Sequence, residues 1–231
     1  MVQEGCPLRL ITALLARNEA ASDRYLKRVL TRCLEFSDTV VVLDDNSDDA
    51  TPDIAREMGC VVETRQNTEL AWGREASARR ELWELASRYA TGPNDWVLIA
   101  DADMEMVGDV RSLCKSRDTN TWSFVLFDLW SDTEYRADGP WVGHTSPRPW
   151  LFAVNRVPPN WTPQWNDRGL HVGHCPLNWP AVVGVAPPET YHWKHWSYAK
   201  PEHRIAKHQQ YMSKKHLLSP SELAHAESIL A

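Results

Sequence analysis

Acidic residues follow three apolar segments in the first half of the chain. The third segment, residues 96–100, leads directly into Asp101 and, one residue further on, Asp103. The segments at residues 8–16 and 40–43 also lead into carboxylate side chains. Two carboxylates that stand one residue apart at the end of a stiff strand can share a divalent cation and the phosphate beside it. This pattern therefore predicts a metal-dependent site for a phosphorylated ligand.

These acids need secondary structure that brings the three segments together. We expect strands at residues 8–16, 39–43, 60–64 and 96–101, with helices at about 22–36, 51–58 and 71–90. Strands and helices that alternate with short links form a parallel sheet covered by crossover helices. Ligands of such sheets bind outside the carboxyl ends of the strands, which is where the acids stand.

The pattern is less regular after residue 103. We expect a helix near residues 107–115, strands at 122–129 and 150–154, a helix at 201–215, and a last short helix capped by Ser219 and Glu222. Residues 156–190 are dense in Pro, Trp, Asn and Gly and show little periodicity. Long irregular segments of this kind often form functional loops.

The composition is that of an ordinary globular protein. The chain has 231 residues, of which 43% are apolar and 24% charged, and its formal net charge is -6. This charge disfavours a nucleic-acid partner without excluding one, because a single basic face would suffice. The sequence has neither an apolar stretch long enough to span a membrane nor the layout of a signal peptide at residues 1–7. Five scattered cysteines fit no zinc or disulfide pattern, so we expect reduced thiols and a cytoplasmic protein of undetermined oligomeric state.

Tryptophan is concentrated in the later part of the chain. Nine of the twelve tryptophans lie beyond residue 121. Aromatic planes stack well on the C–H faces of sugar rings, and they fill cores equally well. The sequence therefore leaves two interpretations open, a sugar-binding surface and an aromatic core.

Three segments together resemble the family 2 glycosyltransferases of GT-A fold. They are residues 11–19, residues 40–51 with their VVxDDxSxDxT-like pattern, and residues 100–103 with the Asp-x-Asp motif. The resemblance covers about residues 8–110 and implies a single GT-A domain over residues 1–231, with a Rossmann-like, mostly parallel sheet flanked by helices. It also implies metal-dependent transfer of a sugar from a nucleotide-sugar donor, with a UDP-sugar expected, to a glycan, protein or small-molecule acceptor.

The resemblance further divides the domain by role. We expect residues 1–110 to bind the nucleotide sugar, residues 111–195 to form the acceptor side, and residues 196–231 to add a C-terminal helical extension. The matching donor-binding residues are Ala16, Arg17, Glu19, Asp45, Arg79, Asp101, Ala102 and Asp103.

Three of these carboxylates have specific counterparts in the family. Asp45 matches the position that hydrogen-bonds the nucleotide base, and Asp101 matches the acid near the ribose and metal. Asp103 matches the acid that ligates the Mn²⁺ or Mg²⁺ bridging the diphosphate. The alternative for such acids is helix capping or turn formation, which is the favoured role of Asp44.

Arg79 lies on the apolar stripe of the expected helix at residues 71–90. A charge on the inward face needs an anionic or polar partner. The resemblance places this arginine beside the nucleotide, and the alternative is a salt bridge to Asp44 or Asp45.

His195 opens a C-terminal segment that resembles the closing segment of small family 2 enzymes, in which a histidine ligates the metal or contacts the diphosphate. We therefore expect His195 to ligate the metal together with Asp103, with His192 as the alternative and ordinary surface histidines as a third reading. Nearby basic residues could contact phosphate or simply form a solvated helix face; they are Lys194, Lys200, Arg204 and Lys207.

The catalytic base is less clear from the sequence. An inverting enzyme needs a carboxylate near the acceptor hydroxyl, and the family often supplies it within a His-Glu pair. Here His171 matches the histidine, but Val172 replaces the glutamate. Asp167 is the nearest acid and Glu189 the next, so Asp167 and His171 are the expected catalytic residues, with a turn aspartate as the alternative for Asp167. A retaining enzyme would need no such base.

Two other functions remain open at this stage. A sugar-1-phosphate nucleotidyltransferase shares the sheet order, but its glycine-rich loop after the first strand is missing from residues 16–20. A non-catalytic carbohydrate- or protein-binding module on a degenerate transferase scaffold would fit the missing glutamate.

Overall fold

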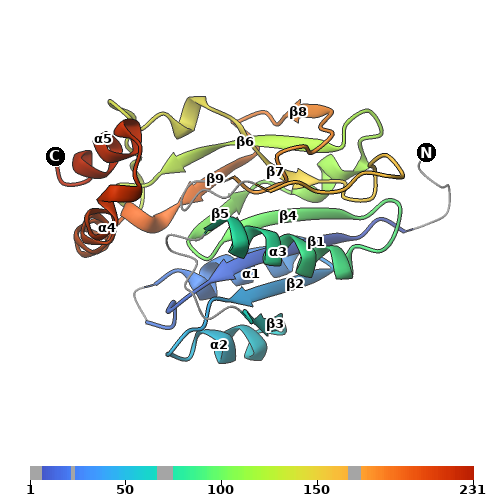
Figure 1. Cartoon of the computed structure of the whole chain (residues 1–231), viewed down its shortest axis with the longest axis horizontal. Helices are drawn as coiled ribbons and strands as arrows, with labels where there is room; N and C mark the ends of the chain where they lie inside the picture. Colours follow the sequence, from blue (N-terminus) through green and yellow to red (C-terminus); the bar gives the residue numbers. More distant parts are fainter. Residues whose placement is uncertain (1–6, 22–23, 67–74, 166–172) are drawn as a thin grey trace.

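The computed structural model describes residues 7–21, 24–66, 75–165 and 173–231 of the chain (Figure 1). Its strands form one curled sheet in the order β3-β2-β1-β4-β7-β6-β9-β5, with β8 paired to β6. The strand pairs β1–β2, β1–β4, β2–β3, β6–β8 and β6–β9 are parallel, whereas β4–β7, β6–β7 and β5–β9 are antiparallel. The predicted class, a mostly parallel sheet flanked by helices, is confirmed.

The first half alternates strands and helices as expected. Its elements are β1 (Leu10–Ala16), α1 (Leu26–Phe36), β2 (Thr39–Asp44), α2 (Thr51–Glu57), β3 (Val61–Thr64), α3 (Glu75–Tyr89) and β4 (Trp96–Asp101). In the register of the sheet, Ala16 pairs with Asp44, and Leu15 pairs with Asp101. The carboxyl ends of β1, β2 and β4 therefore meet at one edge of the sheet.

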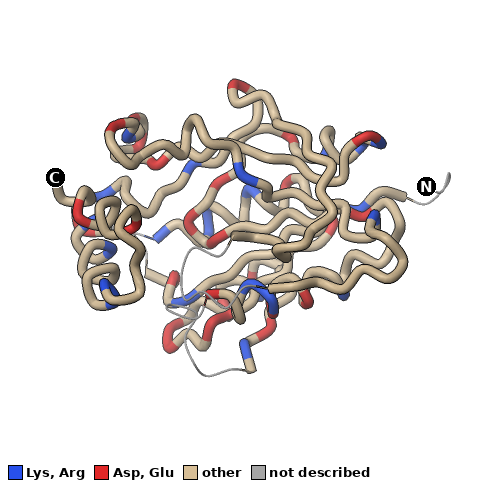
Figure 2. The backbone as a smooth tube through the Cα atoms, turned by 45° about the horizontal axis from the view of Figure 1, so that its top comes forward, with Lys and Arg blue, Asp and Glu red and all other residues tan. Residues whose placement is uncertain are grey.

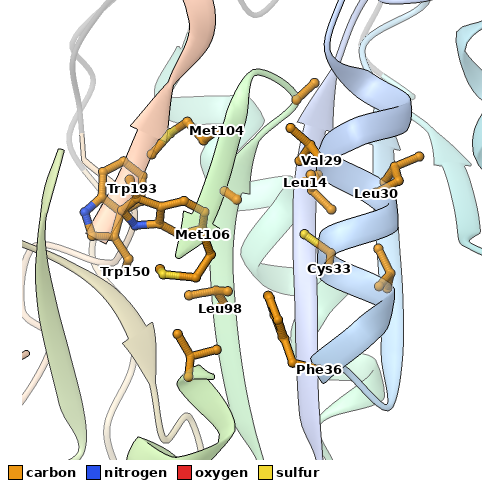
Figure 3. Close-up of a cluster of buried hydrophobic side chains, with 14 of the residues drawn as sticks. Leu14, Val29, Leu30, Cys33, Phe36, Leu98, Met104, Met106, Trp150 and Trp193 are labelled. Carbon is orange, nitrogen blue, oxygen red and sulfur yellow. The ribbon is translucent and has the colours of Figure 1, made fainter. Parts of the chain in front are cut away.

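Both faces of this half are buried, which explains why its strands are continuously apolar. Leu14 of β1 packs in the cluster that includes Val29 and Cys33 of α1 (Figure 3). Ile11 and Ala13, whose side chains alternate with Leu14, belong instead to the cluster under α3. The strands are thus stiff mounts for the residues at their ends.

The second half is built from shorter strands that are paired over long sequence distances. Its elements are β5 (Met104–Val107), the 3₁₀ helix η1 (Val110–Lys115), β6 (Thr121–Asp128), the 3₁₀ helix η2 (Gly143–Thr145), β7 (Arg148–Phe152), β8 (Val183–Val185) and β9 (His192–His195). The strands β8 and β9 were not expected from the sequence. Neither segment shows a sustained alternation of apolar and polar residues, and each forms a strand by pairing with β6.

The prediction of a helix at residues 107–115 is wrong for its first turn. Residues 104–107 form β5, and a 3₁₀ helix begins only at Val110, where Asp109 accepts a hydrogen bond from the Arg111 backbone N–H. Gly108 separates the two elements with φ +89°, and a Cβ at this position would come within 2.4 Å of the Thr190 carbonyl oxygen. Glycine is therefore required where β5 passes the chain that leads into β9.

The C-terminal segment gathers at the end of the molecule opposite the N-terminus (Figure 1). It contains the 3₁₀ helix η3 (Trp196–Tyr198), α4 (Pro201–Ser213), the 3₁₀ helix η4 (Lys215–Leu217) and α5 (Pro220–Ser228). The predicted capping box of Ser219 and Glu222 is confirmed. No helix in the described ranges is long and apolar enough to cross a membrane.

Most tryptophans of the second half belong to the core. Trp141, Trp193 and Trp196 are fully buried, and Trp179 packs edge-on against Trp83 of α3 with ring centroids 5.3 Å apart. The core interpretation is therefore correct for these residues.

Acidic and basic residues are interspersed along the described chain in the view of Figure 2. Several of them form ion pairs between elements, such as Arg28 with Glu105 and Arg111 with Asp38. The cysteines Cys33, Cys60 and Cys114 are buried free thiols, and Cys175 is partly exposed.

Candidate functional site

A cavity of about 1320 Å³ opens at the carboxyl ends of β1, β2 and β4. Most of the predicted site residues line it: Ala16, Arg17, Glu19, Asp45, Arg79, Asp101, Ala102, Asp103 and His195. Asp167 and His171 lie outside the described residues. The structure therefore brings the predicted donor-binding and metal-binding residues together, and their individual roles stay predictions.

Arg79 forms a buried ion pair at the floor of the cavity. Its guanidinium donates to both carboxylate oxygens of Asp101, at 2.6 and 2.9 Å, and to Glu75 at 2.9 Å. Burial alone would raise the pKa of Asp101, but the Arg79 charge overcomes it and holds this pKa well below its usual range. Arg79 therefore uses Asp101 and Glu75, and not the alternative partners Asp44 and Asp45.

Asp103 faces His195 because β5 pairs with β9, which sets Met104 opposite His195. The His195 Nε2 atom lies 3.5 Å from Asp103 Oδ2, and its Nδ1 atom lies 2.7 Å from Asp128 Oδ1. Burial alone would lower the pKa of His195, but Asp103 and Asp128 together raise it to about 10. Ser197 donates a hydrogen bond to the same Asp103 carboxylate.

This arrangement fits a divalent cation. A histidine that ligates a metal through one ring nitrogen usually donates a hydrogen bond from the other nitrogen to a carboxylate. Asp128 is the carboxylate in this position at His195. The described residues contain no group of three or more His, Cys, Asp and Glu side chains placed to hold a metal. Two protein ligands, Asp103 and His195, are nevertheless enough for Mn²⁺ or Mg²⁺ when phosphate oxygens and water complete the shell.

His192, the alternative ligand, lies elsewhere. Its Nδ1 atom is 2.8 Å from the Pro188 carbonyl oxygen, and its ring packs edge-on against Phe127. It is not among the residues that line the cavity.

The Asp45 carboxylate forms a buried ion pair with Arg65, a residue that was not predicted from the sequence. Arg65 is 3% exposed, pairs with Asp45, and also donates to Ser77 and Glu81 at 2.9 Å each. Its only sequence signal is a single basic residue directly after β3. Asp44 accepts a hydrogen bond from the Ser47 backbone N–H at 3.2 Å, which is the turn-forming role expected for it.

The loop after β1 forms the adjoining wall. Arg17 donates to the carbonyl oxygens of Asp45 and Asn46 at 2.6 and 2.8 Å, so it ties the ends of β1 and β2 together. Glu19 lies 3.2 Å from Arg24, and burial raises the pKa of its carboxyl to about 7.

Of the basic C-terminal residues, only Lys207 lines the cavity. Burial alone would lower its pKa, but Tyr211, Asp103 and Asp101 raise it. Arg204 has a structural role, because it donates to the carbonyl oxygens of Trp130 and Tyr198. The Lys207 ammonium is thus available to a phosphate, while Arg204 is not.

Two further cavity residues, Trp150 and His174, were not expected at the site. Their rings are in contact, with centroids 3.7 Å apart and planes tilted by 36°, and His174 Nε2 lies 3.9 Å from Asp101 Oδ2. Trp150 is the one tryptophan of the described chain that lines the cavity, but it is 3% exposed and belongs to the core cluster, so the core interpretation holds for it too.

Comparison with solved structures identifies the fold. S. aureus TarS aligns over 96% of this chain and 42% of its own, with a TM-score of 0.52 and 17% identity. The glucosyl-3-phosphoglycerate synthase of Mycobacterium tuberculosis, solved in complex with Mn²⁺, uridine diphosphate and glucosyl-3-phosphoglycerate, aligns over 52% of this chain and 44% of its own, with a TM-score of 0.36 and 21% identity. The present chain therefore spans less than half the length of these structures.

Sequence comparison identifies the family of the first half. No curated protein sequence matches the chain. The model of glycosyl transferase family 2 matches residues 14–113, which include the ends of β1, β2 and β4 at the cavity. These residues therefore belong to glycosyl transferase family 2, and the chain has the GT-A fold that its sequence predicted.

Proposed function

We propose that this protein is a metal-dependent glycosyltransferase that moves a sugar from a nucleotide-sugar donor, with a UDP-sugar expected, to an acceptor hydroxyl. The observation that carries the proposal is the array of Asp103, His195 and Asp128 beside the Arg79–Asp101 pair in one cavity. The family 2 sequence of residues 14–113 supports the same activity.

The donor wall of the cavity, formed by the ends of β1, β2 and β4, suits a nucleoside diphosphate. Asp103 and His195 would hold Mn²⁺ or Mg²⁺, which when bound offsets the charge of the departing diphosphate. Asp128 fixes the His195 ring, and Lys207 adds a positive charge on the same side. Asp45, oriented by Arg65, is available to the base, and Asp101, oriented by Arg79, is available to the ribose and sugar hydroxyls.

Another part of the cavity wall comes from the second half and would bind the acceptor. This acceptor wall contains Gly143, Arg148, Trp150, His174 and Leu177. The C-terminal segment also contributes, because Ser221, Glu222 and His225 line the same cavity. Its role in our proposal is thus larger than that of a helical extension. A glycan, a protein or a small molecule could present the hydroxyl.

A donor screen tests the proposal. The protein is incubated with Mn²⁺ and, in turn, UDP-glucose, UDP-galactose and UDP-N-acetylglucosamine, and released UDP is measured with and without EDTA. We expect metal-dependent release from at least one donor. UDP binding without any release would favour the binding module, and pyrophosphate formation from UTP and a sugar 1-phosphate would favour the nucleotidyltransferase.

We also propose that the protein works in the cytoplasm. Buried free thiols such as Cys33, Cys60 and Cys114 are typical of a reducing compartment.

A further inference from the structure

The carboxylates around the cavity are already engaged by other groups. Those that line it pair as follows: Glu19 with Arg24, Asp45 with Arg65, Glu75 and Asp101 with Arg79, Asp103 with Ser197 and His195, Asp128 with His195, and Glu222 with the Ser219 backbone. A carboxylate that is paired with a cation is a weak proton acceptor. Glu19 keeps a pKa of about 7, but it stands on the loop after β1, on the donor side.

His174 differs from these groups because its Nε2 atom has no hydrogen-bond partner among the described residues. Its side chain is 13% exposed, and the nearest carboxylate oxygen, that of Asp101, is 3.9 Å away, which is longer than a hydrogen bond. Burial, together with the nearby Arg79 charge, lowers the pKa of His174. The imidazole is therefore neutral at pH 7, and its Nε2 atom is a buried, unpartnered nitrogen of a residue that lines the cavity.

The surroundings of His174 hold its ring in place. The ring packs against that of Trp150 of β7, with ring centroids 3.7 Å apart and an interplanar angle of 36°. The loop that carries it is anchored to the core, since Trp179 donates to the Thr121 hydroxyl at 2.7 Å, and the Leu177 N–H donates to the Gln164 carbonyl at 2.8 Å. A catalytic group gains efficiency when packing fixes it in this way.

We propose that His174 is the catalytic base of the transfer, in place of the carboxylate that the sequence lacks after His171. This inference rests on the proposed function. The acceptor hydroxyl gives its proton to His174 Nε2 while its oxygen forms a bond to the anomeric carbon of the donor sugar. The bond from that carbon to the diphosphate oxygen breaks, and its electron pair leaves with the nucleoside diphosphate. The anomeric configuration is inverted, and the imidazolium later returns its proton to water.

Paired substitutions test the role of this residue. His174→Gln keeps hydrogen-bonding atoms but cannot take the proton, whereas His174→Glu restores a carboxylate base. The reaction measured is hydrolysis of the best donor from the UDP-sugar screen with Mn²⁺, in which water replaces the acceptor. We expect kcat to fall by about 10²- to 10⁴-fold in His174→Gln and to recover at least in part in His174→Glu. UDP affinity should stay within about twofold of the wild type in both variants, and His216→Gln, on the exposed η4, should behave as the wild type.

Several outcomes would overturn the assignment. It fails if His174→Gln hydrolyses the donor at the wild-type rate, or if Asp167→Asn or Glu19→Gln abolishes turnover while UDP affinity stays at the wild-type value. It also fails if NMR shows that the first sugar anomer released retains the donor configuration. A wild type that binds UDP but hydrolyses no donor, or that shows no Mn²⁺-dependent UDP binding, would instead reject the proposed function itself.

Discussion

The two halves of this molecule reach the same cavity by different means. In the first half, neighbouring strands are close in sequence, and the parallel register delivers Asp45, Asp101 and Asp103 to one edge. In the second half, β5 pairs with β9 about 90 residues later, and this pairing sets His195 beside Asp103. Neither half holds both predicted metal ligands, so the proposed site exists only when the antiparallel strands have docked on the parallel ones.

The largest effect should follow from removing the buried charge of the first half. We expect Arg79→Ala to lower the free energy of unfolding by about 3–5 kcal/mol, because Asp101 and Glu75 lose their shared partner. Urea denaturation measures this change. Arg80→Ala is the matched control on the same helix, where an exposed pair with Glu84 contributes less than about 0.5 kcal/mol. Equal losses for the two variants would show that this ion pair is not a structural element of the first half.

A smaller effect, on metal binding, should follow from a change in the second half. Asp128→Asn removes the carboxylate that holds the His195 ring, so we expect Mn²⁺ to bind the UDP-saturated protein about 10- to 100-fold more weakly. Calorimetric titration with Mn²⁺ provides the measurement. Asp138→Asn, at an exposed position that pairs with Arg136, is the control. Unchanged Mn²⁺ affinity in Asp128→Asn would argue against His195 as a ligand.

The smallest effect should come from the aromatic core of the second half. Trp179→Phe loses the hydrogen bond to Thr121 and some packing volume, so we expect the free energy of unfolding to fall by about 1–2 kcal/mol. UDP affinity should not change, because Trp179 is outside the cavity. Thermal unfolding and UDP titration of the same variant test both statements. A loss of UDP affinity without a loss of stability would show that Trp179 contributes to ligand binding and not to the core.

The comparison also explains what the sequence could predict. The strands β1 to β4 and the capping box at Ser219 were predictable because local periodicity and short-range hydrogen bonds define them. The strands β5, β8 and β9 were not, since their partners are distant in sequence and each strand is only three or four residues long.

The same contrast applies to the site. The predicted donor-binding residues follow a motif at strand ends, so the sequence placed Asp45, Asp101 and Asp103 at one site, and all three line the cavity. Arg65 was missed because a single arginine after β3 has no pattern that marks it as buried. His174 was missed because residues 156–190 have little periodicity, and the resemblance directed attention to His171 and Asp167.

The central claim is that Asp103 links a divalent cation to the diphosphate of the donor. Its most direct test is UDP titration of the wild type and of Asp103→Asn by calorimetry, each with Mn²⁺ and with EDTA. We predict that Mn²⁺ raises the UDP affinity of the wild type by at least about 100-fold, in line with several kcal/mol of charge stabilisation, and leaves that of Asp103→Asn nearly unchanged. An equal gain with Mn²⁺ in the two proteins would contradict the account.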